Sequence, residues 1–196
     1  MQEEHVLVEL DIDVINDEIE AAISKILSPA EMERVVQYTL EKAGIVQPVM
    51  LTLLISDDET IRDLNKQYRQ QDKPTDVLSF PLLDEPLIDV PAEQLWLVPD
   101  EEMDEETSEQ PEMAKKKPVF VTPSEIPTVL GDIVISWPTV LKQAQQVGVR
   151  PAYELLYLLS HGVLHLVGYD DQTEAGYQAM VQLQQAVLEA VDQKAK

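Results

Sequence analysis

Residues 151–167, PAYELLYLLSHGVLHLV, are apolar on nearly every side of the helix that their spacing predicts. Pro151 suits the first position of a helix, and Gly168 suits its end. A helix that is apolar all round must be buried, so this segment predicts a central helix covered by other elements. The chain has 196 residues, a length that favours one domain with a real hydrophobic core. We therefore expect residues 1–196 to form a single domain around this helix.

Polar residues interrupt the apolar helix at only a few positions, and four of them fall on one face. Their separations of three, four and four residues keep the side chains on that face. The four are Glu154, Tyr157, His161 and His165. The two histidines lie one turn apart, about 6 Å along the helix axis, so two imidazoles could converge on one ion. They could also be ordinary core histidines near a helix end.

A third candidate ligand follows the helix. Gly168 can reverse the chain, which would bring Asp170 or Asp171 back toward His161 and His165. The spacing His-x3-His-x2-Gly-x2-Asp matches the ligand spacing of a zinc protease pattern, with Asp171 in place of its third histidine. Three protein ligands leave one position open for water or substrate, whereas closed structural zinc sites usually have four. The pattern therefore predicts an open metal site at His161, His165 and Asp171, with Asp170 as the competing third ligand.

A second group of residues lies on the helix predicted after the second strand. Arg62, Lys66 and Arg69 follow one another at helical spacing, and Lys73 comes just beyond. Spacing alone favours a solvated helix face, with Arg69 paired to Asp72. The alternative is a strip that holds phosphate groups, for which arginine is suited by its bidentate contacts. In that case Arg62, Lys66 and Lys73 would be substrate-binding residues.

The rest of the chain mixes strand and helix patterns. Strand patterns cover residues 5–15, 48–56, 75–81 and 128–136, and helical patterns cover 17–43 with a break at 28–29, 57–69, 137–148 and 174–191. This mixture predicts an α+β fold, with a small mixed four-stranded sheet packed against about five helices. The histidine helix would be central in it.

Acidic residues are concentrated in one segment. The net charge is −23, but residues 82–112 hold twelve acidic and no basic residues, which leaves 25 acidic against 14 basic residues elsewhere. The body of the protein is therefore only moderately acidic, which permits an RNA partner but argues against a broad basic surface. The same region is long and rich in proline. We expect an acidic disordered insertion at about 84–122, within which LWLV and KKKPVFV could order locally.

Composition narrows the chemistry and the compartment. The chain has no cysteine, so any transition metal must be bound by histidine and carboxylate. No uninterrupted apolar run reaches the length of a membrane span. The acidic start, MQEEHVLVEL, lacks the basic and then apolar regions of a signal peptide. We therefore expect a cytoplasmic location and no membrane partner.

Three separated blocks, in this order, resemble the signature blocks of the YbeY family. They are LNKQYRQQDKPTDVLSFP, LGDIVIS and HGVLHLVGYDD, and the resemblance spans about residues 51–190. YbeY proteins are metal-dependent endoribonucleases of bacterial rRNA maturation. The resemblance implies an α+β fold, one zinc ion and single-strand-specific cleavage of an rRNA precursor in 16S rRNA 3′-end maturation and ribosome quality control. It also implies the ribosome or small-subunit proteins as partners, and we expect no DNA substrate.

The resemblance also assigns roles to individual residues. His161 and His165 match the first two metal histidines of the family, and Arg69 matches the arginine regarded as essential for RNA cleavage. It therefore implies that Arg69 and His161 are catalytic. The third metal position normally reads histidine in the family, and here it is Asp171. That difference leaves the metal open between zinc and another divalent ion.

Two other functions stay open on the sequence. One is a non-catalytic ribosome-assembly factor in which the metal only stabilises the fold. The other is a zincin-like metallopeptidase. Gly162 argues against the peptidase, because it stands where such enzymes carry the general-base glutamate. The same glycine leaves the general base of a nuclease unidentified.

Overall fold

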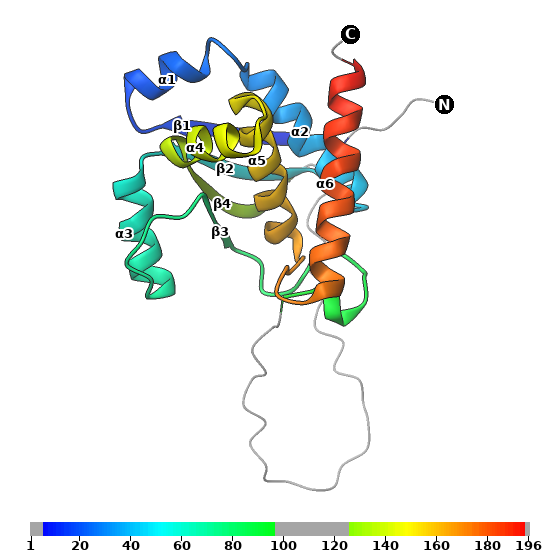
Figure 1. Cartoon of the computed structure of the whole chain (residues 1–196). Coiled ribbons are helices and arrows are strands. Elements are labelled where there is room, and N and C mark those ends of the chain that lie inside the picture. The colour runs from blue at the N-terminus through cyan, green and yellow to red at the C-terminus, as the bar shows by residue number, and fades with distance from the viewer. Residues whose placement is uncertain (1–5, 97–125, 195–196) are drawn as a thin grey trace, which may run out of the picture.

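The computed structural model describes residues 6–96 and 126–194. In these ranges the chain forms one four-stranded sheet and six α-helices (Figure 1). The elements are β1 (Val8–Val14), α1 (Asp17–Ile23), α2 (Pro29–Lys42), β2 (Val49–Ser56), α3 (Asp58–Arg69), β3 (Val77–Pro81), the short 3-10 helix η1 (Ala92–Gln94), β4 (Thr128–Ser136), α4 (Trp137–Val147), α5 (Pro151–Val167) and α6 (Glu174–Lys194). The predicted α+β fold with a small mixed sheet is confirmed, with six α-helices where about five were expected.

The strand order in the sheet is β1-β2-β4-β3. Strands β1, β2 and β4 are parallel, and β3 runs antiparallel to β4 at the edge. Strand β4 contains a bulge, because Met50 pairs with Val129 whereas Leu51 pairs with Gly131. Gly131 has φ +129°, and a Cβ there would collide with the carbonyl oxygen of Phe80 on β3. Glycine therefore allows β3 to approach β4 closely at this edge.

The two faces of the sheet are covered differently. Helices α2 and α5 pack on one face, and α6 lies against both of them (Figure 1). Ile133 and Ile135 of β4 belong to this main core, which also contains Leu159 of α5. Helix α3 covers β3 and β4 on the other face. There Ile61 of α3 packs with Leu78 of β3 and Val134 of β4 in a second, smaller core. Successive side chains of β4 point to opposite faces of the sheet, and they therefore contribute to two separate cores.

The expected break in the first helical region separates α1 from α2. Ser28 caps α2, because its hydroxyl accepts a hydrogen bond from the Glu31 backbone N–H and the Glu31 carboxylate accepts one from the Ser28 N–H. Pro29 occupies the first turn, where its missing N–H costs no helical hydrogen bond. The bonds from Ser28 lower the pKa of Glu31. Local capping therefore explains the sixth helix.

Helix α5 is central, as its apolar composition predicts. It contacts α2, α4, α6, β3 and β4, and its Leu, Val and Ser side chains are mostly buried. One polar pair lies inside this packing. Thr39 of α2 donates to the Val35 carbonyl oxygen at 2.7 Å and shares a hydrogen bond of 2.9 Å with Ser160 of α5. Both hydroxyls are fully buried and both are hydrogen-bonded, so they cost little to bury.

The first part of the expected acidic insertion packs against the end of α5. Ile88 is buried there, and the Leu87 N–H donates to the Val167 carbonyl oxygen at 2.9 Å. Residues 84–96 are therefore ordered in the structure, contrary to the expectation for this stretch. Residues 97–122 of the expected insertion lie outside the described residues, and disorder there stays a prediction.

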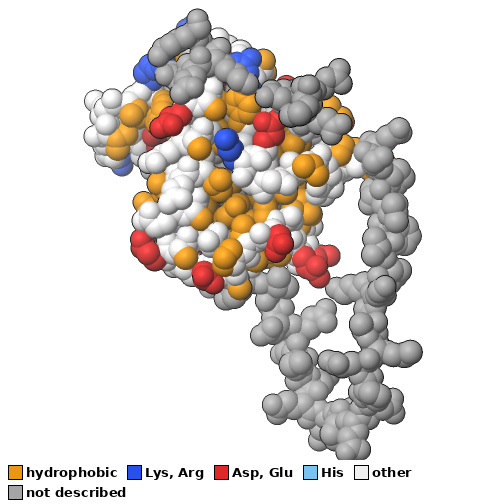
Figure 2. Space-filling model, turned by 90° about the vertical axis from the view of Figure 1, so that its right-hand side faces the viewer, with side chains coloured by type: hydrophobic (Ala, Val, Ile, Leu, Met, Phe, Trp, Pro, Cys, Tyr) orange, Lys and Arg blue, Asp and Glu red, His pale blue; other side chains and the backbone are white. Residues whose placement is uncertain are grey.

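Hydrophobic and charged side chains are unevenly distributed on the face seen from the side of α6. The described residues show hydrophobic side chains in the middle of this face and acidic ones around them, several along the lower edge (Figure 2). Few basic side chains appear among the residues described on that face. No helix in the described ranges combines the length and the apolarity needed to cross a membrane.

Candidate metal centre and its cavity

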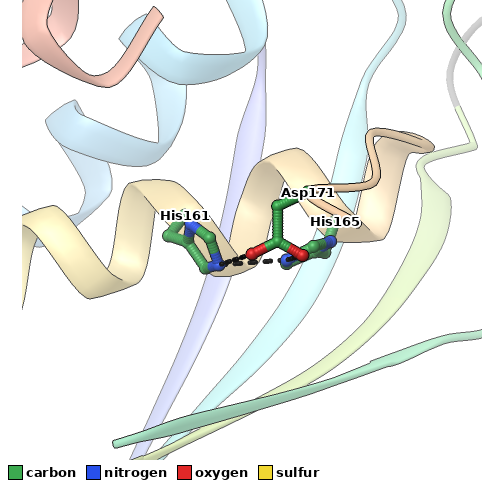
Figure 3. Close-up of side chains that lie close together, drawn as sticks. All are labelled: His161, His165 and Asp171. Atoms are coloured by element: carbon green, nitrogen blue, oxygen red, sulfur yellow. Dashed lines mark hydrogen bonds and ion pairs between the residues drawn. The ribbon is translucent and has the colours of Figure 1, made fainter. Parts of the chain in front are cut away.

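The side chains of His161, His165 and Asp171 point toward one another (Figure 3). Their candidate ligand atoms all lie within 4.8 Å of one another. The two histidine Nε2 atoms are 3.0 Å apart. The Asp171 carboxylate places one oxygen 3.7 Å from Nε2 of His161 and the other 3.9 Å from Nε2 of His165. The structure therefore brings together the three ligands that the sequence predicted.

The chain reversal that returns Asp171 begins at Gly168. This glycine has φ +128°, and a Cβ there would lie 3.0 Å from the Cα of Pro86. The loop that follows is held by a hydrogen bond of 2.9 Å from the Asp170 N–H to the Gln94 carbonyl oxygen. Positive φ and close packing both require glycine at this position. The turn aims Asp171, rather than Asp170, at the two imidazoles.

The orientation of His165 is fixed by a backbone carbonyl. Nδ1 of His165 lies 2.9 Å from the carbonyl oxygen of Tyr169, which can only accept a hydrogen bond, so Nδ1 carries the proton. Its Nε2 then carries no proton, and the lone pair faces Nε2 of His161, 3.0 Å away. Burial lowers the pKa of His165, and the neighbouring His161 lowers it further. Both effects favour the neutral imidazole, which is the form that binds a metal.

The donor set fits a divalent ion. At metal–nitrogen distances of about 2.0–2.1 Å, tetrahedral coordination places two nitrogen ligands roughly 3.3 Å apart, close to the 3.0 Å between His161 and His165. Two imidazole nitrogens and a carboxylate are an accepted zinc ligand set, and they also suit other divalent metals. The group could therefore hold a metal ion. The carboxylate of Asp170 has a different partner, because it accepts a hydrogen bond of 3.3 Å from the Gln172 N–H.

The metal group opens onto a cavity of about 790 Å³. The end of α3, strand β3, the loop before β3, Trp96, helix α5, the loop after it and helix α6 all contribute to its wall. Its lining includes Arg69, Asp76, Trp96, Tyr157, His161, His165, Asp171, Tyr177, Met180, Val181 and Gln184. This volume is in the range of ligand-binding pockets and far exceeds what an ion requires.

Arg69 is the one predicted basic residue that reaches this cavity. It is the last residue of α3, and no ion pair involves it in the described part of the chain. The alternative that paired Arg69 with Asp72 is wrong. Asp72 instead binds Arg62 through Nε at 2.6 Å and Lys66 through Nζ at 2.7 Å. Arg69 is therefore left available to a ligand in the cavity.

The other predicted substrate contacts lie away from the cavity. Arg62, Lys66 and Lys73 are exposed and do not line it. The hydrogen bond with Asp72 raises the pKa of Arg62, and the bonds from Lys66 and Arg62 lower the pKa of Asp72. Arg62 and Lys66 are thus engaged by an acid of their own chain. Their role in substrate binding stays a prediction.

Only part of the polar face of α5 lines the cavity. Tyr157, His161 and His165 line the cavity, whereas Glu154 does not. Burial raises the pKa of Glu154, and the charge of Asp76 raises it further. Burial also raises the pKa of Tyr157, with added contributions from Tyr177 and Glu154.

The sequence predicted that LWLV, which contains Trp96, could order locally, but it did not predict a role for Trp96 at the site. The Trp96 indole N–H donates to the His165 carbonyl oxygen at 3.2 Å, and its backbone N–H donates to the Gly168 carbonyl oxygen at 3.0 Å. Leu95 pairs with Tyr169 in an isolated β-bridge. This segment therefore holds the end of α5 and the turn that leads to Asp171, a candidate metal ligand. Its signal in the sequence was a single tryptophan inside an acidic region.

Comparison with known proteins places the chain in a family. The family model described as Endoribonuclease YbeY matches residues 13–192. The chain belongs to the YbeY family. The Endoribonuclease YbeY of Synechococcus sp. (strain JA-3-3Ab) is 34% identical over 89% of this chain and 89% of its own length. That of Desulforamulus reducens is 38% identical over 81% of this chain and 82% of its own length.

The fold of this YbeY-family chain is also found in a solved structure. The solution structure of TM1509 from Thermotoga maritima matches it with a TM-score of 0.51 and 22% sequence identity. The match covers 93% of this chain and 88% of the other. At this identity the likeness concerns the fold alone.

Gly162 separates this YbeY-family site from that of a zincin peptidase. A Cβ at position 162 would lie 2.9 Å from Cγ2 of Ile133 on β4, within the buried contact between α5 and the sheet. A glutamate there would have to displace the Ile133 side chain. The position that carries the general base of such peptidases therefore faces the sheet and not the cavity.

Proposed function

We propose that this chain is a metal-dependent endoribonuclease that cleaves single-stranded RNA during rRNA processing. The observation that carries the proposal is that Arg69 and the group of His161, His165 and Asp171 line one cavity. The relatives named above, which match most of the chain, are called endoribonucleases. Family membership and the site geometry thus support the same activity.

The residues of the site would have different roles in the reaction. His161, His165 and Asp171 would hold the ion and leave a further position open toward the cavity. When bound, the ion supplies Lewis-acid chemistry that polarises a phosphoryl oxygen and activates water. Arg69, which has no ion-pair partner among the described residues, would stabilise the charge that develops on the phosphoryl oxygens.

Asp76 also lines the cavity, but its hydrogen bonds argue against a role in proton transfer. Its carboxylate accepts from the Val77 N–H at 2.9 Å, from the Thr75 hydroxyl at 3.1 Å and from the Gln143 amide at 3.0 Å. These three donors occupy lone pairs on both oxygens of the carboxylate. We therefore assign Asp76 a structural role at the start of β3.

The dimensions of the cavity support a single-stranded substrate. A cavity of about 790 Å³ has room for one or two nucleotides, whereas a duplex would have to lie outside it. We further propose zinc as the ion and 16S rRNA 3′-end maturation and ribosome quality control as the process. The ribosome or small-subunit proteins would be its partners, in the cytoplasm. These finer assignments rest on the resemblance of the three sequence blocks.

Cleavage of a labelled single-stranded rRNA precursor fragment tests the proposal. We expect the zinc-loaded protein to cut the RNA and Arg69→Ala to reduce the rate roughly 100- to 1,000-fold while it still binds the metal. Arg150→Ala is the matched control, because it removes an exposed arginine that does not line the cavity and has no predicted role in substrate binding. Equal cutting by wild type and Arg69→Ala would contradict the assignment of the site.

Two further outcomes would point to the other functions considered. If the metal-loaded protein cuts no RNA but chelation lowers its melting temperature, a non-catalytic assembly factor with a structural metal becomes the better explanation. Digestion of casein that depends on the metal would favour a peptidase, against the geometry at Gly162.

A further inference from the structure

The wall that α6 contributes to the cavity ends at a polar side chain, Gln184, which has no role in the proposed function. Tyr177, Met180, Val181 and Gln184 line the cavity, and their separations of three, one and three residues place them on one face of α6. The stripe begins at a half-exposed tyrosine, passes over a buried methionine and ends at a buried amide. None of these residues takes part in the metal group or in the role given to Arg69.

The amide of Gln184 is buried, and only its nitrogen has a hydrogen-bond partner among the described residues. The side chain is 1% exposed, and its Nε2 donates a hydrogen bond of 3.2 Å to the carbonyl oxygen of Tyr157 on α5. Its Oε1 is also buried, and no described protein group donates to it. The bond to Tyr157 fixes which end of the amide is the acceptor, because two carbonyl oxygens would repel each other. A buried acceptor without a donor is costly unless a ligand or water supplies one.

The amide of Gln184 contacts α5 one helical turn before the metal group. Gln184 binds the backbone of Tyr157, which precedes His161 by four residues, or about 6 Å along the α5 axis. At the other end of the stripe, the ring of Tyr177 is 49% exposed at the mouth of the cavity. An aromatic ring at the mouth and a polar acceptor at depth suit a flat ligand with a donor on its edge.

We propose that this wall is a nucleobase subsite, in which Gln184 Oε1 accepts a hydrogen bond from the exocyclic amino group of a base and Tyr177 stacks on that base. The proposal rests on the proposed function, because it assigns the base of a nucleotide next to the phosphate held at the metal group. One N–H of Gln184 Nε2 donates to the Tyr157 carbonyl oxygen, whereas Oε1 has no donor among the described residues, so Oε1 is the atom that a ligand would satisfy. The subsite therefore favours a base with an exocyclic amino group, which adenine, cytosine and guanine carry, over a base without one.

Binding of two matched mononucleotides tests the subsite without relying on cleavage. The probes are adenosine 5′-monophosphate and purine riboside 5′-monophosphate, which differ only in the amino group. Calorimetric titration of each into the full-length zinc-loaded protein should give an affinity about five- to tenfold higher for the adenosine nucleotide. Equal affinity for the two, or no binding of either, would overturn the proposal.

Variants separate base recognition from a structural role of the amide. Gln184→Met keeps the length of the side chain and should bind both nucleotides equally, while Gln185→Met, at the exposed neighbouring position, should keep the preference. If Gln184→Met retains the preference, the amide does not read the base. Tyr177→Ala changes a half-exposed residue and so tests the subsite even if Gln184→Met fails to fold. It should weaken both nucleotides by a similar factor, and unchanged affinities would overturn the stacking role.

Cleavage assays then separate this inference from the proposed function. If the wild type prefers the adenosine nucleotide but cuts no RNA, the subsite stands and the endoribonuclease proposal fails. If it cuts RNA but binds both nucleotides equally, the endoribonuclease stands and the subsite is overturned.

Discussion

The imidazole Nδ1 of His165 donates a hydrogen bond to the backbone carbonyl oxygen of Tyr169, at a distance of 2.9 Å. The Tyr169 N–H in turn donates to the Leu164 carbonyl oxygen at 3.0 Å. These bonds join the last turn of α5 to the start of the loop that carries Asp171. One contact therefore sets both the tautomer of a candidate metal ligand and the path of the chain toward Asp171, the next candidate ligand.

The first prediction distinguishes the two adjacent aspartates. Asp171→Ala should lower the affinity for zinc at least about 100-fold, because it removes one of three ligands. Asp170→Ala should lower it by less than about tenfold, since that carboxylate accepts a hydrogen bond from the Gln172 N–H instead. Competition with a chromophoric zinc chelator measures both. A larger loss in Asp170→Ala would show that the loop turns the other way when metal binds.

The second prediction concerns the stability of the metal-free protein below neutral pH. Burial and the neighbouring His161 lower the pKa of His165 in the folded state beneath its usual value of about 6.5. Over the interval between the folded pKa and about 6.5, the unfolded chain binds more protons at this residue than the folded one. The contribution of His165 to stability is therefore complete above about 6.5 and is lost as the pH falls through the folded pKa.

Urea denaturation at several pH values measures this contribution. The free energy of unfolding of wild type should fall more steeply below pH 6.5 than that of His165→Gln, which cannot take up the proton. Parallel curves for the two proteins would mean that other groups account for the acid sensitivity. Both proteins must be freed of metal first, because a bound ion would itself prevent protonation.

The regular elements and the metal group were predictable because their signals are local. Each strand and helix carries its own apolar period, and Pro151 and Gly168 mark the two ends of α5. The histidines share a helix, so their relative position follows from helix geometry alone. Asp171 is only six residues beyond His165, and the glycine between them limits the paths that the chain can take.

Long-range contacts explain what the sequence did not reveal. Trp96 reaches His165 across 69 positions, and nothing in its acidic surroundings indicates that partner. Asp72 lies close in sequence to Arg69, but the left-handed residue Gln70 ends α3 and the chain folds back, so Asp72 meets Arg62 and Lys66 instead. Such pairings depend on the path of a loop, which residue spacing does not specify.

The third prediction tests the packing of the metal helix against the sheet. Gly162→Ala should destabilise the protein by about 1–3 kcal/mol through overpacking, offset in part by the higher helix propensity of alanine, about 1 kcal/mol. The clash is specific, because the added Cβ would lie 2.9 to 3.2 Å from three side-chain atoms of Ile133. In an Ile133→Ala background, Gly162→Ala should stabilise the protein instead, since the added methyl group fills part of the space that the truncated side chain leaves.

A double-mutant cycle in urea measures this coupling. The two positions should show an interaction free energy of about 1 kcal/mol or more. An identical effect of Gly162→Ala in both backgrounds would mean that α5 moves as a whole to accept the methyl group.

The last prediction follows from the two cations that Asp72 holds. Under the proposed function, Asp72→Asn frees Arg62 and Lys66 to contact RNA phosphates near the end of α3, where Arg69 lines the cavity. RNA affinity at low salt should rise several-fold, and the plot of log affinity against log salt should steepen by about 0.7 for each cation engaged. Asp63→Asn is the control. It removes the same charge from an exposed position of α3 without releasing both cations from Asp72. Fluorescence anisotropy with a labelled single strand measures all three proteins, and equal shifts in the two variants would show that net charge, not the Asp72 pairing, controls binding.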